Sequence, residues 1–508
     1  MYRRISIVAL ASLALTACAA DEVVAPVKAP NSAALSKSAD GSGNNGKFLV
    51  LMKGQSIDPG FESQVKNLGG KVTRSHAGAG IASVSGLTDA AAAQLATTAG
   101  VSQVKHDVVV SLDLPTSPSV LPDAAVIGFR GKSSHPSPTQ AAGYAFQWNL
   151  RLIGADKAWA AGKLGSSSVT VAILDTGIDY DSPDLNGLVD LSRSVSFMGP
   201  ELGETSLSDD EITDRYFPTR NKISDYEGHG TNVATQVSSN AAKFAGVTAK
   251  TRLIGVKVLG ADGSGSFGGI LDGVLWAADL HANVANLSLG ATFPTAGNQD
   301  FIDFIARVFD YAKQKRMLIV VAAGNSSKDL DNNGATYVAF CDAPHVLCVS
   351  AVGPAVAKDI GTPKEDAPAY YTNFGLNSIS VAAPGGSGSA TTSNWAWGPD
   401  NFSWVWSDCS KTLIAGFTAT GPITPCAGGF FSYVAIGTSQ ASPHAAGLAA
   451  LLISVTGESK SMEIKRYIEK SAFLPTIFPP QYYGHGRINV WKAVRDQNND
   501  GNGSERRR

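Results

Sequence analysis

The chain has 508 residues, of which 44% are apolar, and its 41 basic and 43 acidic residues leave a net charge of -2. This much hydrophobic material is enough for two to four domains with large cores, and it excludes a globally disordered or fibrous protein. The charge balance offers no basic field that would attract nucleic acid or an anionic membrane, so we expect neither as an electrostatic partner.

Residues 1–22 have the pattern of an export signal. Two arginines precede an apolar stretch over 5–15, which is shorter than the roughly 20 residues that a membrane-spanning helix needs. The stretch ends in Leu15-Thr16-Ala17-Cys18, which resembles the bacterial lipobox, whose cysteine is lipidated after cleavage. The alternative is ordinary signal cleavage after Ala19. Both interpretations predict export from a bacterial cell, and the first also predicts a precursor anchored to the membrane through lipid on Cys18.

Cysteines of exported proteins usually pair, because the compartment is oxidising. If Cys18 carries lipid, four cysteines remain, with three pairings open. Proximity in the sequence favours a Cys341–Cys348 and a Cys409–Cys426 disulfide. No Cys-x-x-Cys spacing occurs, so a metal site is the weaker interpretation.

Two kinds of segment precede the largest part of the chain. Residues 23–46 are rich in Ala, Ser, Gly and Asn and read as a flexible tether. Residues 47–113 follow the order β-α-β-β-α-β, which predicts a small ferredoxin-like α+β domain with its last strand over 101–112. Residues 114–146 carry many prolines and serines, and they predict an exposed linker that is easily cut.

Residues 147–495 show continuous apolar runs separated by helical stretches. This alternation of apolar strands and helices predicts an α/β domain built on a doubly wound, mostly parallel sheet with helices on both faces. The end of the chain, 496–508, reads as a polar tail. The expected strands are Val169–Leu174, Arg252–Val258, Val284–Leu289, Leu318–Ala323 and Val346–Val352, and the expected helices include Gly269–Leu280, Asp300–Lys315 and Ala445–Val455.

Three polar residues have places in this domain that point to chemistry. Asp175 directly follows an apolar strand, where functional groups of open α/β sheets collect. His229 stands between two glycines just before a helix, and Ser439 opens a long apolar helix. Each has a structural alternative, as a turn residue, a loop histidine or a helix cap. Together, in the order Asp, His, Ser, they match one known arrangement of nucleophile, base and orienting carboxylate.

The motifs around these residues carry a family resemblance. Asp175-Thr176-Gly177, Gly228-His229-Gly230-Thr231 and Gly437-Thr438-Ser439-Gln440-Ala441 resemble the three signatures of the subtilisin-like serine proteases (peptidase S8). The resemblance extends over 147–494, and residues 47–113 resemble the inhibitory propeptide (inhibitor I9) of that family. It implies a serine endopeptidase made as a self-processing zymogen, with cleavage in 114–146, protein or peptide substrates and its own propeptide as an intramolecular inhibitor. Because Cys18 precedes this cleavage site, we expect maturation to release the enzyme from any lipid anchor, so that the mature enzyme is periplasmic or extracellular.

The resemblance assigns roles residue by residue. Ser439 is expected to be the nucleophile, His229 its base and Asp175 the residue that orients the base. Asn325, in Ala322-Ala323-Gly324-Asn325, is expected to stabilise the oxyanion together with the backbone N–H of Ser439. The extended substrate is expected to pair with two strand edges, Ser288-Leu289-Gly290 on one side and Ser264-Gly265 on the other.

Gln440 departs from the family pattern, and His444 lies close enough to Ser439 in the sequence to be mistaken for its base. Gln440 stands where the family usually has a methionine, and glutamine cannot form a sulfoxide. His444 lies about 140° around the helix from Ser439, which predicts a packing residue rather than the base.

We expect no cofactor for catalysis, and we expect a monomer. Structural calcium is common in the family, but no run of residues locates a site. Residues 496–501 open like a calcium loop, yet Arg507 stands where the bidentate glutamate belongs.

Two rival classes are disfavoured. A serine esterase of the α/β-hydrolase type would carry Gly-x-Ser-x-Gly and the order Ser, Asp, His. A non-catalytic binding protein on the same fold would be expected to lack one of the three residues, and all are present.

Overall fold

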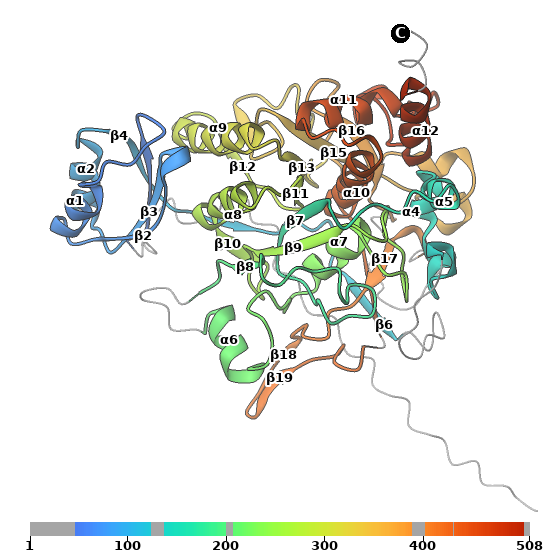
Figure 1. Ribbon diagram of the computed structural model, residues 1–508, viewed down its shortest axis with the longest axis horizontal. Helices are drawn as coiled ribbons and strands as arrows, with labels where there is room; N and C mark the ends of the chain where they lie inside the picture. The colour runs from blue at the N-terminus through green and yellow to red at the C-terminus, as the bar shows by residue number, and fades with distance from the viewer. Residues whose placement is uncertain (1–45, 123–136, 200–206, 389–401, 430, 502–508) are drawn as a thin grey trace, which may run out of the picture.

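The computed structural model describes residues 46–122, 137–199, 207–388, 402–429 and 431–501. A small N-terminal domain lies beside a large α/β domain, next to its helices α8 and α9 (Figure 1). The predicted export signal, Cys18 and the tether up to residue 45 lie outside the described residues.

The N-terminal domain is a four-stranded antiparallel sheet with two helices, in the element order that the sequence predicts. The sheet order is β2-β3-β1-β4. Its elements are β1 (Phe48–Met52), α1 (Phe61–Asn67), β2 (Lys71–His76), β3 (Ile81–Ser85), α2 (Asp89–Ala96) and β4 (Val101–His106).

The two faces of this small sheet bury different partners. Phe48, Val50 and Met52 alternate along β1 and pack with Val65 of α1 and Leu95 of α2. The residues between them, Leu49 and Leu51, belong instead to the core of the large domain. Because side chains of a strand alternate between faces, one strand serves both cores. The small sheet therefore docks onto the large domain through its second face.

Polar contacts frame this docking surface. Arg74 forms an ion pair of 2.7 Å with Asp272 on α8 (Phe267–Asp279). The side-chain amide of Gln103 donates to Asp303 on α9 (Gln299–Gln314) at 2.6 Å. Helices α8 and α9 of the large domain thus both contact the N-terminal domain.

The prediction of one strand over 101–112 was wrong, because the structure has two strands there. β4 ends at His106, and β5 (Val109–Ser111) leaves the small sheet to pair with β10 (Ser264–Ser266) of the large domain. Asp107 lies at the break, where its carboxylate accepts the backbone N–H of Gly268 at 2.9 Å. The unsatisfied N–H groups of a helix start favour a carboxylate, so Asp107 caps α8 and redirects the chain.

The large domain is built on a seven-stranded sheet whose neighbouring strands all run parallel, as predicted. Alternate residues of β7 face different layers: Ala172 and Leu174 pack on the α8–α9 side, and Val171 and Ile173 on the other. In spatial order the strands are β16 (Val381–Pro384), β15 (Val346–Val352), β13 (Leu318–Ala322), β11 (Val284–Leu287), β7 (Thr170–Asp175), β9 (Arg252–Lys257) and β8 (Val195–Ser196).

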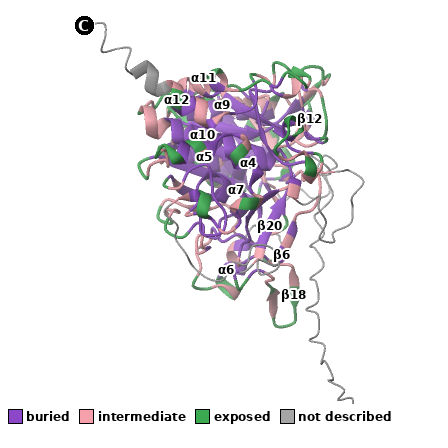
Figure 2. Cartoon of the chain, turned by 90° about the vertical axis from the view of Figure 1, so that its right-hand side faces the viewer, coloured by how far each residue is buried: buried purple, intermediate pink, exposed green. Residues whose placement is uncertain are grey.

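The second layer contains the helices that carry the candidate site. α7 (His229–Val237) and α10 (Thr438–Thr456) lie deep in the interior, where Figure 2 shows them largely in purple. Residues 445–452 of α10 are all buried, and partial exposure begins at Ile453. Four further helices complete this layer: α4 (Trp148–Leu152), α5 (Ala155–Ala160), α11 (Ser461–Ser471) and α12 (Val490–Gly501).

The predicted linker is not wholly exposed. Within it, β6 (Ser119–Pro122) pairs antiparallel with β20 (Phe431–Ala435), which in turn pairs with β17 (Val405–Asp408). Leu121 packs with Phe244 and Trp406. The linker therefore contributes a strand to the large domain. Residues 123–136 lie outside the described part.

The other helix and strands are α6 (Asp209–Tyr216), the hairpin β18 (Gly416–Thr418)–β19 (Gly421–Ile423) and the pair β12 (Thr292–Pro294)–β14 (Thr336–Val338). Phe293 of β12 and Tyr337 of β14 pack in the core on the α8–α9 side. The predicted polar tail begins inside α12, which continues to Gly501, so 496–501 is helical rather than a calcium loop. Among the described residues, no helix combines the length and hydrophobicity needed to cross a membrane.

Candidate active site

The fold brings together the three residues that the sequence singles out. Asp175 is the last residue of β7, His229 is the first of α7, and Ser439 lies in the first turn of α10. Asp175 and His229 are fully buried and Ser439 is 4% exposed. Strand and helix ends from distant parts of the chain thus meet at the carboxyl edge of the parallel sheet, as open α/β folds favour.

Asp175 and His229 form the tightest contact of the site. The Nδ1–H of His229 donates to a carboxylate oxygen of Asp175 at 2.7 Å, and the Thr176 N–H donates to the same oxygen at 2.8 Å. Burial lowers the pKa of His229, but the carboxylates of Asp175, Glu227 and Asp225 outweigh it and raise that pKa to about 9. The contact fixes the imidazole with Nε2 directed away from Asp175, which is the orientation of a general base.

Glycines beside His229 permit close packing. Gly228 has φ +104°, and a Cβ there would lie 2.8 Å from Leu413 and Tyr433 side chains. A Cβ on Gly230 would lie 2.1 Å from the carbonyl oxygen of Gly177. The glycines therefore let the turn fit closely against its neighbours, and His229 is fully buried.

Ser439 forms no hydrogen bond with the histidine in this structure. Its hydroxyl donates to the carbonyl oxygen of Ser288 at 3.0 Å. Within the described residues, Nε2 of His229 has no hydrogen-bond partner, although it is buried. The serine–histidine hydrogen bond of a catalytic pair is therefore not formed in this structure.

Asn325 follows β13 and contacts both the Ser439 helix and an earlier segment of the chain. Its side-chain oxygen accepts the N–H and the hydroxyl of Thr438, both at 2.9 Å. Its Nδ2 donates to the backbone carbonyl of Asp113. Sequence reasoning missed Thr438, whose two hydrogen bonds aim the Asn325 amide. Its position directly before Ser439 in the signature is the signal that could have identified it.

The segment leading to Asp113 runs along one of the predicted substrate edges. Ser111 pairs with Ser264 and Val110 with Gly265, and the N–H of Leu112 donates to the Gly263 carbonyl at 2.9 Å. Asp113 then lies beside a pocket of about 210 Å³ that Leu289, Gly290 and Ser439 also line. Across the described residues, no backbone hydrogen bond joins 288–290 to this segment, so pairing at that second edge stays a prediction.

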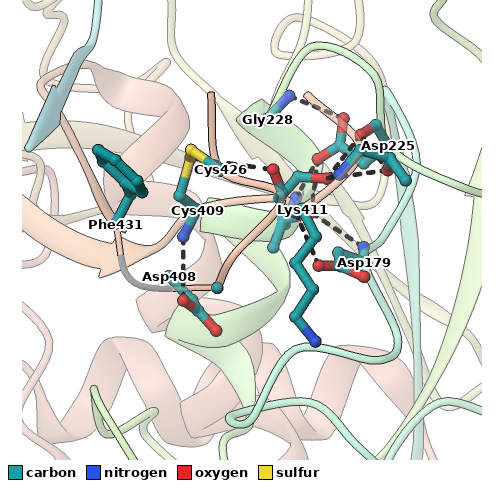
Figure 3. Close-up of a disulfide and its surroundings, with 12 residues drawn as sticks. Asp179, Asp225, Gly228, Asp408, Cys409, Lys411, Cys426 and Phe431 are labelled. Carbon is teal, nitrogen blue, oxygen red and sulfur yellow. Dashed lines mark hydrogen bonds between the residues drawn. A yellow bond between two sulfur atoms is a disulfide. The ribbon is translucent and has the colours of Figure 1, made fainter. Parts of the chain in front are cut away.

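Both predicted disulfides, Cys341–Cys348 and Cys409–Cys426, are formed. The second closes a loop that holds the turn before His229 (Figure 3). From this loop, the Lys411 N–H donates to Asp179 at 2.9 Å. The hydroxyls of Ser410 and Thr412 donate to the Asp225 carbonyl at 2.6 and 2.9 Å. The Asp225 carboxylate in turn accepts the N–H groups of Gly228 and Thr231, so the loop supports the start of α7.

His444 is a packing residue, as predicted. It is buried between the Asn149 side chain and the Gln440 carbonyl, each 2.7 Å from a ring nitrogen, and burial lowers its pKa to about 4. Gln440 is also buried.

The acidic residues after Asp175 have protein partners. Asp179 pairs with Arg220 at 2.5 Å, and Asp184 accepts the N–H groups of Lys243 and Phe244. The described part of the chain contains no group of three or more His, Cys, Asp or Glu side chains placed to hold a metal ion.

A parallel α/β fold with an aspartate, a histidine and a serine in this chain order and at one sheet edge defines a class of serine endopeptidase. Residues 166–506 match the profile described as "Subtilase family". The chain therefore belongs to the subtilase family, whose members hydrolyse peptide bonds of protein or peptide substrates and need no cofactor for catalysis.

Individual relatives agree with this assignment, and a solved structure shares the fold. The chain is 30% identical to "Thermophilic serine proteinase" of Bacillus sp. (strain AK1) over 71% of its own length and 69% of that protein. It is 28% identical to "Thermitase" of Thermoactinomyces vulgaris, covering 69% of this chain and 96% of that one. The fold resembles the crystal structure of the epidermin leader peptide processing serine protease (EpiP) of Staphylococcus aureus, with a TM-score of 0.65, 20% identity, and 88% and 97% coverage.

Proposed function

We propose that this subtilase is an exported endopeptidase that processes itself by cutting its own chain at Asp113–Leu114, with Ser439 as the nucleophile. The observation that carries the proposal is the hydrogen bond from the Asn325 side-chain amide to the carbonyl oxygen of Asp113. Asp113 and Ser439 line the same pocket. In this arrangement the chain supplies its own first substrate.

The chemistry follows from the groups at the site. The Ser439 hydroxyl turns from the Ser288 carbonyl toward Nε2 of His229, transfers its proton there, and its oxygen attacks the Asp113 carbonyl carbon. Asn325 and the Ser439 N–H stabilise the negative oxygen that forms. The intermediate collapses when the imidazolium gives the proton to the Leu114 nitrogen, which leaves as an amine. Water then hydrolyses the ester between Asp113 and Ser439, and His229 again takes and returns the proton.

The inhibitory role of residues 47–113 rests on their place in the cleft. β5 occupies the Ser264–Gly265 edge that a substrate would need, and the domain before it docks through Leu49, Leu51 and the Arg74–Asp272 ion pair. After cleavage these contacts persist, so the domain stays as an inhibitor until it is degraded. A subtilase whose cleft is filled by its own segment is inactive toward other substrates.

Export and a lipid anchor are the remaining parts of the proposal. Export is supported by the signal pattern of residues 1–22 and by two disulfides, which persist in oxidising compartments. Lipid on Cys18 would belong to the part that cleavage removes. The precursor is then membrane-bound and the mature enzyme is soluble, whereas mature enzyme that stays with membranes after complete processing would contradict this.

A comparison of wild type with Ser439→Ala tests the proposal. Ser454→Ala, on the same helix, is the matched control. All three proteins are expressed, and their intact masses and casein hydrolysis are measured. We expect wild type and the control to be cut and to digest casein, and Ser439→Ala to stay full-length and inert. If all three are cut alike, another protease does the processing; if Ser439→Ala also digests casein, Ser439 is not the nucleophile.

A further inference from the structure

The pocket next to Asp113 contains one positive charge. Among the described residues that line it, Lys328 alone is cationic, and Asp113 itself alone is anionic. The other lining positions are small, apolar or neutral polar, and they include Leu289, Thr292 and Val338. The electrostatic character of the pocket toward a bound side chain is therefore set by Lys328.

Lys328 is held by its backbone beside this pocket. Its N–H donates to the side-chain oxygen of Asn373 at 3.0 Å, and its carbonyl accepts the N–H of Phe374 at 2.9 Å. The same Asn373 oxygen accepts the Ser326 N–H at 3.1 Å, so one side chain shapes the turn from Asn325 to Lys328. The lysine side chain extends from a fixed turn that also carries the Asn325 oxyanion donor.

Asp113 is one of the residues that line the pocket. One of its carboxylate oxygens accepts the backbone N–H of Asn325 at 3.3 Å. Burial raises the pKa of this carboxyl, while the Asn325 hydrogen bond and the positive charge of Lys328 act to lower it. Lys328 and Asp113 form no direct ion pair in the described structure, so the ammonium acts across the pocket. About 210 Å³ remain beside Asp113, which is room for a longer acidic side chain.

We propose that this pocket selects an acidic side chain, so that the enzyme cleaves after aspartate or glutamate, with Lys328 as the specificity-determining residue. The inference rests on the proposed function, because it takes Asp113–Leu114 as the first bond cut. Two observations support it: an aspartate carboxylate is seated at the pocket, and the described lining presents its one cation there. The substrate class is a protein or peptide with an exposed acidic residue before the scissile bond.

The competing interpretation is that the pocket prefers a large apolar side chain, for which Leu289 and Val338 provide surface and the remaining volume provides room. Asp113 would then be a poor residue for this pocket that is cut only because it is tethered there. The two interpretations predict opposite rankings of aspartate and leucine.

Peptides that differ only in the residue before the scissile bond distinguish the two. With the mature enzyme, kcat/KM is measured for aspartate, glutamate, asparagine, leucine and lysine at that position. Asparagine matches aspartate in size and lacks its charge. Lys328 is exposed, and an exposed charge pair changes a rate by at most about fivefold, so we expect aspartate to exceed asparagine by about two- to fivefold, and less at high salt. Aspartate or glutamate should also exceed leucine.

Substitutions of Lys328 then assign the cause. In Lys328→Ala we expect the aspartate-to-asparagine ratio to fall to about one, and in Lys328→Glu we expect the preference to move toward lysine. Lys364→Ala, an exposed lysine elsewhere, is the control and should keep the wild-type ratio. In the precursor, Asp113→Asn should be processed more slowly than wild type.

Two results would overturn the inference. Leucine peptides cut as well as or better than aspartate peptides would contradict the acidic preference while leaving the endopeptidase intact. An aspartate-to-asparagine ratio that is the same in wild type, Lys328→Ala and Lys328→Glu would remove Lys328 as its cause. Loss of all activity, including toward casein, in properly folded wild type would instead contradict the proposed function itself.

Discussion

Asn325 donates its side-chain amide to the backbone carbonyl of Asp113, although the two residues are 212 positions apart in the sequence. This hydrogen bond places a backbone carbonyl of the chain against Asn325, the side chain that the subtilase resemblance identifies as the oxyanion donor. If residues 47–113 are an inhibitory propeptide, as we propose, this carbonyl occupies the position of a substrate carbonyl.

Asn325→Ala should slow both self-processing and peptide hydrolysis. The expected loss is about 10²–10³-fold in kcat, a cost measured for one such donor in a subtilisin, because the amide stabilises charge that develops only during reaction. The measurement is kcat on a peptide substrate after processing in trans. Asn332→Ala, an exposed asparagine on the neighbouring loop, is the control. A loss confined to KM would contradict the assignment.

Activity should increase with pH over an unusually alkaline range. Only the neutral imidazole of His229 can accept the Ser439 proton, and the carboxylates around it raise its pKa to about 9. The acid limb of kcat/KM should therefore lie above the ordinary histidine value of about 6.5. A pH profile of the mature enzyme tests this, and a midpoint at or below 6.5 would contradict it.

Glu227→Gln should move that limb to lower pH. The Glu227 carboxylate accepts the His229 N–H at 2.7 Å, and its negative charge contributes to the raised pKa of the imidazole. Removing the charge while keeping the size makes protonation of His229 less favourable. Glu227→Asp, which keeps the charge, is the control. An unchanged midpoint in Glu227→Gln would show that Asp175 and Asp225 account for the whole effect.

Removing the Cys409–Cys426 disulfide should cost more stability than removing Cys341–Cys348. The sequence separations are 17 and 7 residues, and in the chain-entropy model loops of these sizes stabilise by about 3 and about 2 kcal/mol. Paired Cys→Ser variants in the Ser439→Ala background are compared by denaturant unfolding. Loss of the 409–426 bridge should also lower kcat in the active enzyme, because its loop holds the Asp225 turn before His229. Equal effects of both pairs would contradict this account.

Wild type should retain activity in peroxide better than Gln440→Met. Gln440 is buried directly beside Ser439, and a methionine there could be oxidised to a polar sulfoxide next to the nucleophile. Residual kcat is followed with time in peroxide for both proteins. Equal rates of inactivation would remove this role for the glutamine.

The Asp, His and Ser motifs predict the site because each couples a functional residue to local backbone geometry. Asp175 ends an apolar strand, and Ser439 begins a helix after a glycine. Apolar runs likewise predict the parallel strands. Because both faces of the sheet are buried, each strand is a continuous run of apolar residues rather than an alternation of apolar and polar ones. These features depend on a few neighbouring residues, which is why the sequence alone is enough to locate them.

Other features depend on contacts between distant segments. Val109 and Val110 look like a continuation of β4, and only the capping of α8 by Asp107 reveals why the chain leaves the small sheet. Leu121 is an apolar residue in a proline-rich stretch, and its burial depends on Phe244 and Trp406. Asp113 lies between β5, which leaves the small sheet, and Leu121, which is buried in the large domain. Its position beside Asn325 therefore depends on long-range contacts, and no local pattern predicts it.

The mass of the first fragments released from freshly folded wild-type precursor tests the central claim most directly. The account predicts that the first cut separates Asp113 from Leu114, so that one early product ends at Asp113 and the other begins at Leu114. A first cut elsewhere in 114–146, with the Asp113–Leu114 bond still intact, would contradict it.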